Sequence, residues 1–249
     1  TSHISKRLAV SILTFCMLGG TLLHAQEIIM PQRWSQALYE VEPLFASDTL
    51  TILVAGDIMM HTRQIESAHR GGQEYDFSSY FHLLEDRIRE ADIAIANMEF
   101  TLAGEPYTGY PCFSAPDSFA SYIARCGFDI FLTANNHIYD KGGKGAERTL
   151  EIYRNIDGVQ FTGLASDEDE MDATTPLIIL RKGIKTALIN FTYGTNMGST
   201  THWPKVNYMA GRDLLKGAVD KAHEEDADLI IALPHWGDEY VLSHNGSQE

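Results

Sequence analysis

The chain has 249 residues, of which 44% are hydrophobic and 21% charged, a composition typical of a folded protein with one large domain or two small ones. Its formal net charge is −15, from 34 acidic against 19 basic residues. No cluster of Lys and Arg interrupts this acidity, which argues against nucleic acid as a partner and would repel anionic substrates unless a bound cation reversed the local field.

The first 25 residues have the pattern of a secretory signal peptide. Lys6 and Arg7 precede an apolar run from Leu8 to Leu23, and Ala25 offers a small residue for cleavage. The run is about 16 residues long, shorter than the roughly 20 needed to span a bilayer. We therefore predict export to the periplasm or the cell surface, with an uncleaved membrane anchor as the alternative.

The mature chain is predicted to contain one domain. Residues 26–49 resemble an irregular lead-in, with a short helix over 34–40, and the domain occupies residues 50–249. Two cysteines, Cys112 and Cys126, remain after the signal peptide. Export would permit a disulfide between them, but both could equally be buried thiols, and the sequence leaves this open.

Strand-like apolar runs alternate with helical patterns along this domain, which predicts an α/β fold. The segment 177–191 differs, because its two apolar runs flank a short turn, and this predicts a hairpin and therefore a mixed sheet system. The acidic run 166–172 is interpreted as a solvated loop rather than a cation site. The predicted strands are 51–55, 92–96, 129–133 and 228–233, and the predicted helices are 78–90, 117–126, 144–154 and 210–226.

Each of the four predicted strands ends in polar residues with ligand chemistry. Because catalytic and ligand-binding groups collect at the carboxyl ends of strands in open α/β sheets, we expect these side chains to converge. Carboxylate, amide and imidazole groups without thiolate favour Mn, Zn or Fe, as one or two ions. The side chains are Asp57 after the first strand, Glu99 after the second, Asn136, His137 and Asp140 after the third, and His235 after the fourth.

Taken singly, each of these residues also has a structural explanation. Asp57 could cap a turn or helix, Glu99 could be an exposed loop charge, and His235 could pack in an aromatic core. The other histidines of the domain lack the strand-end context, and most of them are interpreted as surface or structural residues: His61, His69, His82, His202, His223 and His244.

The motifs taken together resemble the bacterial capsule-synthesis family, CapA, of poly-γ-glutamate biosynthesis. They are Gly-Asp-Ile-Met at 56–59, Asn-Met-Glu at 97–99, Ala-Asn-Asn-His-x-x-Asp at 134–140 and His-Trp-Gly-Asp-Glu-Tyr at 235–240. The resemblance covers residues 50 to 240 and implies a metallophosphoesterase-like sandwich of two mixed β-sheets flanked by helices.

The same resemblance implies a role for each matched residue. His137 would be the acid or base beside the metal, Asp140 would orient it, and Glu239 would support the site. Asn136 would also bind the substrate oxyanion. The implied metal ligands are Asp57, Glu99 (as a bridging carboxylate), Asn136 and His235.

Two departures from the family pattern bear on activity. Asp57 is followed by Ile58 and Met59, where phosphoesterases usually carry Asp-x-His, and a later His-Pro-His block is absent, so the domain is expected to be incomplete at its C-terminus. Three functions remain open. The chain is a metal-dependent hydrolase of a phosphoester or γ-glutamyl amide, a non-catalytic component of a membrane-associated assembly that handles an anionic polymer, or an inactive truncated remnant.

Overall fold

A computed structural model describes residues 49–246 and 248–249. The signal peptide predicted over 1–25, and the lead-in over 26–48 with its helix at 34–40, lie outside the described residues. Within the described part of the chain, the structure contains no helix with the length and apolar character required to traverse a bilayer.

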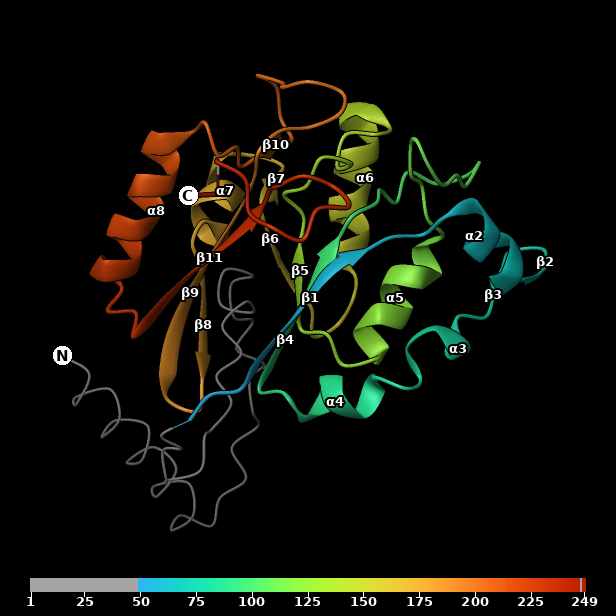
Figure 1. Ribbon diagram of the computed structural model, residues 1–249, viewed down its shortest axis with the longest axis horizontal. Coiled ribbons are helices and arrows are strands. Elements are labelled where there is room, and N and C mark those ends of the chain that lie inside the picture. Colours follow the sequence, from blue (N-terminus) through green and yellow to red (C-terminus); the bar gives the residue numbers. More distant parts are fainter. Residues whose placement is uncertain (1–48, 247) are drawn as a thin grey trace, which may run out of the picture. The chain divides into compact units, whose positions relative to one another are not determined.

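The larger sheet has four parallel strands, in the order β1 (Ile52–Ile58), β4 (Ile93–Met98), β5 (Ile130–Leu132) and β6 (Gln160–Thr162). Every residue of β4 is buried, as expected for a central strand covered on both faces. The register between β1 and β4 shifts between Ala55 and Asp57, so that Asp57 lies opposite Asn97. All four strands run in one direction, so their carboxyl ends share one edge of the sheet (Figure 1).

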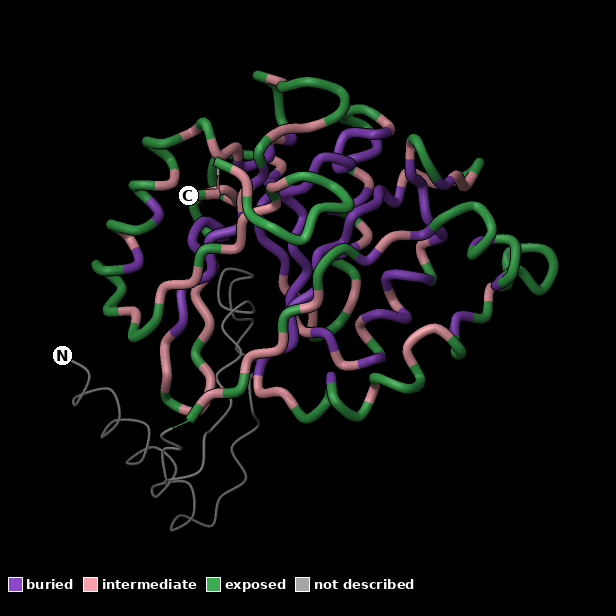
Figure 2. Tube along the Cα trace, viewed as in Figure 1, coloured by how far each residue is buried: buried purple, intermediate pink, exposed green. Residues whose placement is uncertain are grey.

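Helices cover one face of this sheet: α2 (Thr62–Ala68), α3 (Ser78–Phe81), α4 (Glu85–Glu90), α5 (Asp117–Arg125) and α6 (Gly142–Arg154). Between α2 and α3 a short antiparallel pair joins β2 (His69–Gly71) to β3 (Glu74–Tyr75). Aromatic side chains such as Phe119, Phe131 and Tyr153 fill the space between helices and sheet. Figure 2 shows the central strands as buried and the outer turns of the helices as exposed.

The single helix predicted over 78–90 is wrong, because the structure divides it into α3 and α4. The Tyr122 hydroxyl accepts the backbone N–H of Phe81 at 3.1 Å, an N–H that within α3 would otherwise donate to the carbonyl of Phe77. The ring of Phe81 also packs against Phe128. The backbone N–H of Leu84 donates to the carbonyl of Phe81 at 2.7 Å, and this tight turn separates α3 from α4.

The smaller sheet has the order β11 (Leu229–His235), β9 (Ile184–Thr192) and β8 (Leu177–Arg181). The predicted hairpin is confirmed: β8 and β9 pair antiparallel across Lys182 and Gly183, whose φ angles of 51° and 79° suit the tight two-residue turn. Strand β11 pairs parallel with β9. The other elements of this part are α7 (Glu168–Thr174), α8 (Arg212–Glu224) and the antiparallel pair β7 (Leu164–Ala165) and β10 (Lys205–Val206).

A second apolar core lies between the two sheets. Ile93, Ile95 and Ile130 of the larger sheet pack in one cluster with Leu177 and Leu188 of the smaller sheet. This cluster makes the two sheets a sandwich, and it confirms the predicted α/β fold of two sheets flanked by helices. Of these two sheets, only the smaller is mixed: β9 pairs antiparallel with β8 and parallel with β11.

The prediction that the acidic run 166–172 is a solvated loop is wrong, because most of the run forms the start of α7. The Asp167 carboxylate accepts the backbone N–H of Glu170 at 2.8 Å and so caps the helix. Acidic side chains in a first turn are stabilised by the unpaired N–H groups of that turn. This helix-terminus chemistry explains the local density of negative charge without a cation.

The two cysteines are free thiols in this structure. Cys126 is buried beside α4, with its Sγ 3.7 Å from an Oε atom of Glu85, and burial raises the pKa of this thiol. Of the two alternatives left open by the sequence, the structure shows separate thiols.

Candidate metal centre

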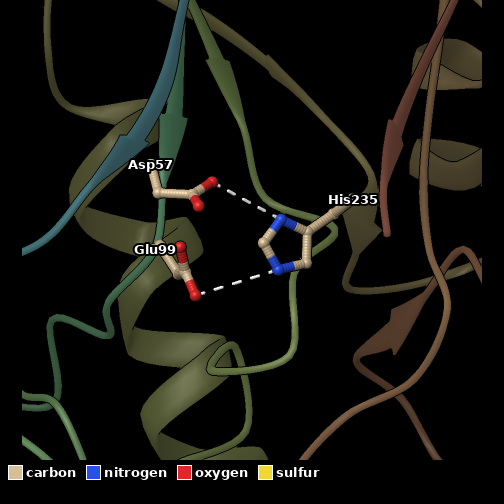
Figure 3. A group of neighbouring side chains, drawn as sticks. All are labelled: Asp57, Glu99 and His235. Atoms are coloured by element: carbon tan, nitrogen blue, oxygen red, sulfur yellow. Dashed lines mark ion pairs between the residues drawn. The ribbon is translucent and has the colours of Figure 1, made fainter. Parts of the chain in front are cut away.

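Three strand ends bring two carboxylates and an imidazole together (Figure 3). Asp57 lies near the end of β1, Glu99 directly follows β4, and His235 is the last residue of β11. The backbone N–H of Glu99 donates to the carbonyl of Ile58 at 3.0 Å, which extends the β1–β4 pairing to the site. One potential ligand atom from each of Asp57, Glu99 and His235 lies within 4.8 Å of the others.

Glu99 is the most perturbed group of this centre. Only 5% of the residue is exposed, and its Oε2 atom is buried without a hydrogen-bond partner. Burial, and next the charge of Asp57, raises the pKa of Glu99 to about 8. Its Oε1 atom lies 3.8 Å from Nε2 of both His137 and His235, too far for a hydrogen bond. Ionising a carboxyl buried in this way is costly unless a counter-charge is supplied.

Asp57 shows the opposite behaviour at the same site. Interaction with His235 lowers the pKa of Asp57 against the opposing effect of partial burial, and the Asn97 side chain adds a hydrogen bond from Nδ2 to Oδ1 at 2.7 Å. Asp57 Oδ1 lies 3.5 Å from His235 Nδ1. Of the two carboxyl groups, Asp57 therefore ionises readily, whereas Glu99 holds its proton at neutral pH.

The imidazole of His235 is held by neighbours on several sides. Its Nε2 atom lies 2.8 Å from Oδ1 of Asn136, which accepts a hydrogen bond there, and Asn97 Nδ2 lies 3.3 Å from its Nδ1 atom. A hydrogen on Nε2 would donate to Asn136, and a hydrogen on Nδ1 would face Asp57. The ring of Tyr193 stacks on that of His235, with centroids 6.1 Å apart.

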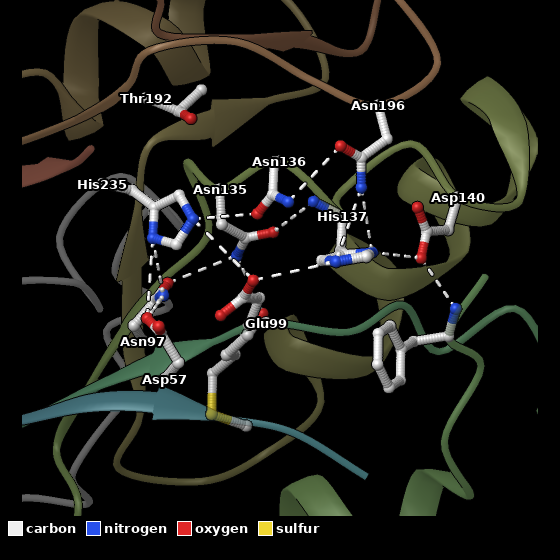
Figure 4. A network of polar contacts seen from close by, with 12 residues as sticks. Asp57, Asn97, Glu99, Asn135, Asn136, His137, Asp140, Thr192, Asn196 and His235 are labelled. Carbon is white, nitrogen blue, oxygen red and sulfur yellow. Dashed lines mark hydrogen bonds and ion pairs between the residues drawn. The ribbon is translucent and has the colours of Figure 1, made fainter. Parts of the chain in front are cut away.

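A second histidine lies on the other side of Glu99 (Figure 4). His137 Nδ1 is 2.7 Å from Oδ2 of Asp140, and the same oxygen accepts the backbone N–H of Phe113 at 2.7 Å. The Phe113 ring meets the imidazole edge-on, at 4.7 Å between centroids. These contacts fix the ring so that Nε2 faces Glu99.

All the residues predicted as ligands or as acid and base occur around one site. Asp57, Glu99, Asn136, His137 and His235 line a pocket of about 370 Å³, and Asp140 lies directly behind His137. Glu239 also lines the pocket, and its charge contributes to the raised pKa of Glu99. The strand-end argument thus placed these side chains correctly, whereas their roles remain predictions.

Four further residues belong to this site and had no role in the sequence prediction. Asn97 and Asn135 belong to the motifs at 97–99 and 134–140, and Asn135 Nδ2 donates to the carbonyl of Met98 at 3.0 Å. Tyr193 and Asn196 lie in the loop after β9, where apolar periodicity gave no signal. Tyr193 lines the pocket, whereas Asn196 is an exposed residue beside it that contacts Asn136 and His137. His61, which was not predicted as a site residue, also lines the pocket, and its ring packs on Phe113 at 5.2 Å between centroids.

The residues present fit a divalent cation. Two carboxylates and an imidazole are the donor set that Mn²⁺, Zn²⁺ and Fe²⁺ accept. The unpartnered Oε2 atom of Glu99 supplies a lone pair that no side chain of the described residues uses. A cation bound between Glu99 and Asp57 would offset the repulsion between the two carboxylates, which, after burial, raises the pKa of Glu99.

Comparison with known proteins gives consistent results. The family model described as "Bacterial capsule synthesis protein PGA_cap" matches residues 51–249. "Capsule biosynthesis protein CapA" of Bacillus anthracis is 25% identical over 234 residues, covering 89% of this chain and 55% of the relative. "PGA biosynthesis protein CapA" of Bacillus subtilis (strain 168) is 24% identical over 217 residues, covering 82% and 53%. The chain therefore spans about half the length of the curated relatives it matches.

Two solved structures also match. The 5'-nucleotidase precursor from Thermus thermophilus has a TM-score of 0.46 at 14% identity, covering 76% of this chain and 37% of that one. The NAD nucleotidase (NadN) of Haemophilus influenzae has a TM-score of 0.44 at 17% identity, covering 76% and 34%.

Proposed function

This chain belongs to the bacterial capsule synthesis protein family, and from that premise we propose that it is a cation-dependent hydrolase acting in capsule or poly-γ-glutamate synthesis. Its substrate would be a phosphoester or a γ-glutamyl amide. As part of the same proposal, the signal-peptide pattern over residues 1–25 directs the domain out of the cytoplasm, to the periplasm or the cell surface.

The observation that carries the proposal is the buried carboxyl of Glu99, whose Oε2 atom has no hydrogen-bond partner. A structural carboxyl at this depth would have a Lys, Arg or backbone N–H partner. Glu99 instead faces Asp57, and its Oε1 atom makes only long ion pairs of 3.8 Å with two imidazoles. A buried carboxyl that is costly to ionise and has no close partner is typical of a ligand set.

The proposed cation is held by Asp57, Glu99 and His235, with Asn136 as a further predicted ligand. When bound, a divalent cation supplies Lewis-acid polarisation of a substrate oxygen and lowers the pKa of water. Asn97 orients Asp57 through its 2.7 Å hydrogen bond, and the Asn136 Oδ1 atom holds the ring of His235 through its 2.8 Å contact with Nε2. Such supporting contacts typically alter metal affinity by about 10- to 100-fold.

His137 is the proposed general acid. Its Nδ1–H is held by Asp140, so a second proton would reside on Nε2, the atom that faces the pocket. Asp140 orients the imidazole through Nδ1, and the contact with the Phe113 ring limits the rotation of the imidazole. The leaving group would receive the proton from Nε2. This role requires the leaving group to lie between His137 and the carboxylates.

The test is hydrolysis of p-nitrophenyl phosphate and of γ-glutamyl-p-nitroanilide by purified protein, metal-free and with Mn²⁺ or Zn²⁺. We expect at least one of the two substrates to be hydrolysed when metal is present, and neither when it is absent. His235→Ala should lose both turnover and bound metal. His223→Ala, which removes an exposed imidazole on α8, should retain both.

The alternative outcome defines a second function. Protein that binds metal stoichiometrically but turns over neither substrate would contradict the hydrolase and support a cation-bridged polymer-binding component. Binding of poly-γ-glutamate that survives both Asp57→Ala and His235→Ala would support a scaffold whose polymer site lies elsewhere.

A further inference from the structure

The loop after β9 is fastened over the site at two points. The backbone N–H of Tyr193 donates to the carbonyl of His235 at 3.0 Å, and the backbone N–H of Asn196 donates to the carbonyl of Asn136 at 2.8 Å. A turn between Thr195 and Gly198 closes the loop behind them, with an N–H to carbonyl bond of 3.1 Å. The loop therefore joins the two histidine-bearing sides of the centre and holds the Asn196 side chain in place.

The Asn196 amide nitrogen has no strong acceptor among the described residues. Its Nδ2 atom lies 3.3 Å and 3.4 Å from Nδ1 and Nε2 of His137, and near-equal distances place it along the lone pair of neither nitrogen. His137 Nδ1 is already committed to Asp140 at 2.7 Å. Asn196 Oδ1 makes only a long contact to Asn136 Nδ2, at 3.4 Å. Figure 4 shows the two amides beside His137.

The pocket itself offers an anion no Lys or Arg side chain. Its described lining includes four carboxylates and three imidazoles, and of these imidazoles His137 and His235 already have proposed roles as acid and as cation ligand. An anionic substrate oxygen beside the cation would therefore gain from neutral N–H donors of the protein. Preorganised amide donors of this kind stabilise developing oxyanions in many hydrolases.

We propose that Asn196 is a substrate-binding residue that donates an Nδ2–H, beside Asn136, to an oxygen of a tetrahedral oxyanion. The inference rests on the proposed function and specifies which residue receives the substrate anion. The oxyanion would be a phosphate group or the tetrahedral centre formed during amide hydrolysis, and the same donor geometry serves both.

Inorganic phosphate is the probe, because it is a tetrahedral oxyanion that needs no turnover. Mn²⁺ is first titrated into wild type, Asn196→Ala, Asn196→Asp and Lys144→Ala by calorimetry, and phosphate is then titrated into each Mn²⁺-loaded protein. Lys144 is the control, because it lines a separate pocket of about 350 Å³ with Lys141 and Arg148, the other place where phosphate could bind.

We expect all four proteins to bind Mn²⁺ alike. Phosphate affinity should fall about 10- to 100-fold in Asn196→Ala, as for loss of a hydrogen bond to a charged group. It should fall further in Asn196→Asp, which replaces a donor by a carboxylate, and should be unchanged in Lys144→Ala.

The results separate the two claims. Wild type that binds no Mn²⁺ overturns the proposed function and this inference with it. Mn²⁺-loaded wild type that binds no phosphate, or that binds it no more tightly than Asn196→Ala, overturns this inference alone. Loss of phosphate binding in Lys144→Ala but not in Asn196→Ala assigns the anion to the basic pocket and also overturns it.

Discussion

Two acidic regions of this molecule differ in how their charges are satisfied. At the start of α7, Asp167 caps the helix and Glu170 binds Arg154 Nη2 at 2.7 Å. At the strand ends, Glu99 is buried with an unpartnered oxygen and faces the like charge of Asp57. The first region contains the densest run of acidic residues in the sequence, yet only the second has the properties of a cation site.

The difference teaches that local acidity in a sequence does not identify a ligand set. Six successive positions from Asp167 to Asp172 include one non-acidic residue, and the helix terminus, Arg154 and Lys221 account for much of that charge. Asp57 and Glu99 are 42 positions apart in the sequence and meet only because β1 and β4 are neighbours. Burial without a partner is the distinguishing property.

The largest effect that would break this comparison concerns cation binding itself. Asp57→Ala should weaken Mn²⁺ binding at least about a hundredfold, because it removes one of the two charged ligands of the proposed cation. Glu170→Gln should leave Mn²⁺ affinity unchanged. Calorimetric titration of both variants is the measurement. A Glu170→Gln protein that loses Mn²⁺ while Asp57→Ala keeps it would reverse the assignment of the two regions.

The second effect concerns the stability of metal-free protein. The pKa of Glu99 is raised from 4.5 to about 8 in the folded state. Stability from the protonated form is therefore fully present below the unfolded pKa and is lost as pH rises through about 8. Glu99→Gln should stabilise metal-free protein at pH near 9 by about 2 kcal/mol.

The same substitution should change little at pH near 5. Urea unfolding with chelator present measures both values. Equal stabilities of wild type and Glu99→Gln at the higher pH would show that Glu99 has a partner and that the contrast with α7 is false.

A third effect sharpens the comparison through proton release. Because Glu99 must ionise to bind a cation, Mn²⁺ affinity should rise up to about tenfold per pH unit below the pKa of about 8 and level off above it. Titrations in buffers of different ionisation enthalpy would detect the released proton. Affinity that is flat between roughly pH 6.5 and 8 would contradict proton displacement from Glu99.

The smallest effect belongs to α7. Glu170→Gln should cost about 1 kcal/mol of unfolding free energy at neutral pH, because it weakens a partly buried ion pair with Arg154 and a favourable charge in the first turn. Asp169→Asn, in the same turn, should cost only a few tenths of a kcal/mol through the helix dipole. Chemical denaturation compares them. Equal losses would show that the Arg154 pair contributes nothing specific.

The strands that carry the site, and the side chains at their ends, could be predicted from the sequence. Apolar runs indicated β1, β4, β5 and β11, and the rule that ligands gather at carboxyl strand ends placed Asp57, Glu99 and His235 together. The parallel register of β1 and β4 is what converts that expectation into a short distance.

The loops could not be predicted in the same way. Tyr193 and Asn196 reach the site because backbone hydrogen bonds to His235 and Asn136 fold their loop inward, and no periodic pattern encodes such contacts. His61 was not predicted as a site residue because it lacks the strand-end context, and its approach to the pocket depends on packing against Phe113. The start of α7 was predicted as a solvated loop from its charge density alone.

The most direct test of the central claim is the anomalous scattering from a crystal of this protein grown with Mn²⁺. The account predicts one or two strong peaks within coordination distance of Asp57, Glu99 and His235. A crystal that diffracts well and shows no peak between these three side chains, or shows its only peak beside α7, would contradict the account.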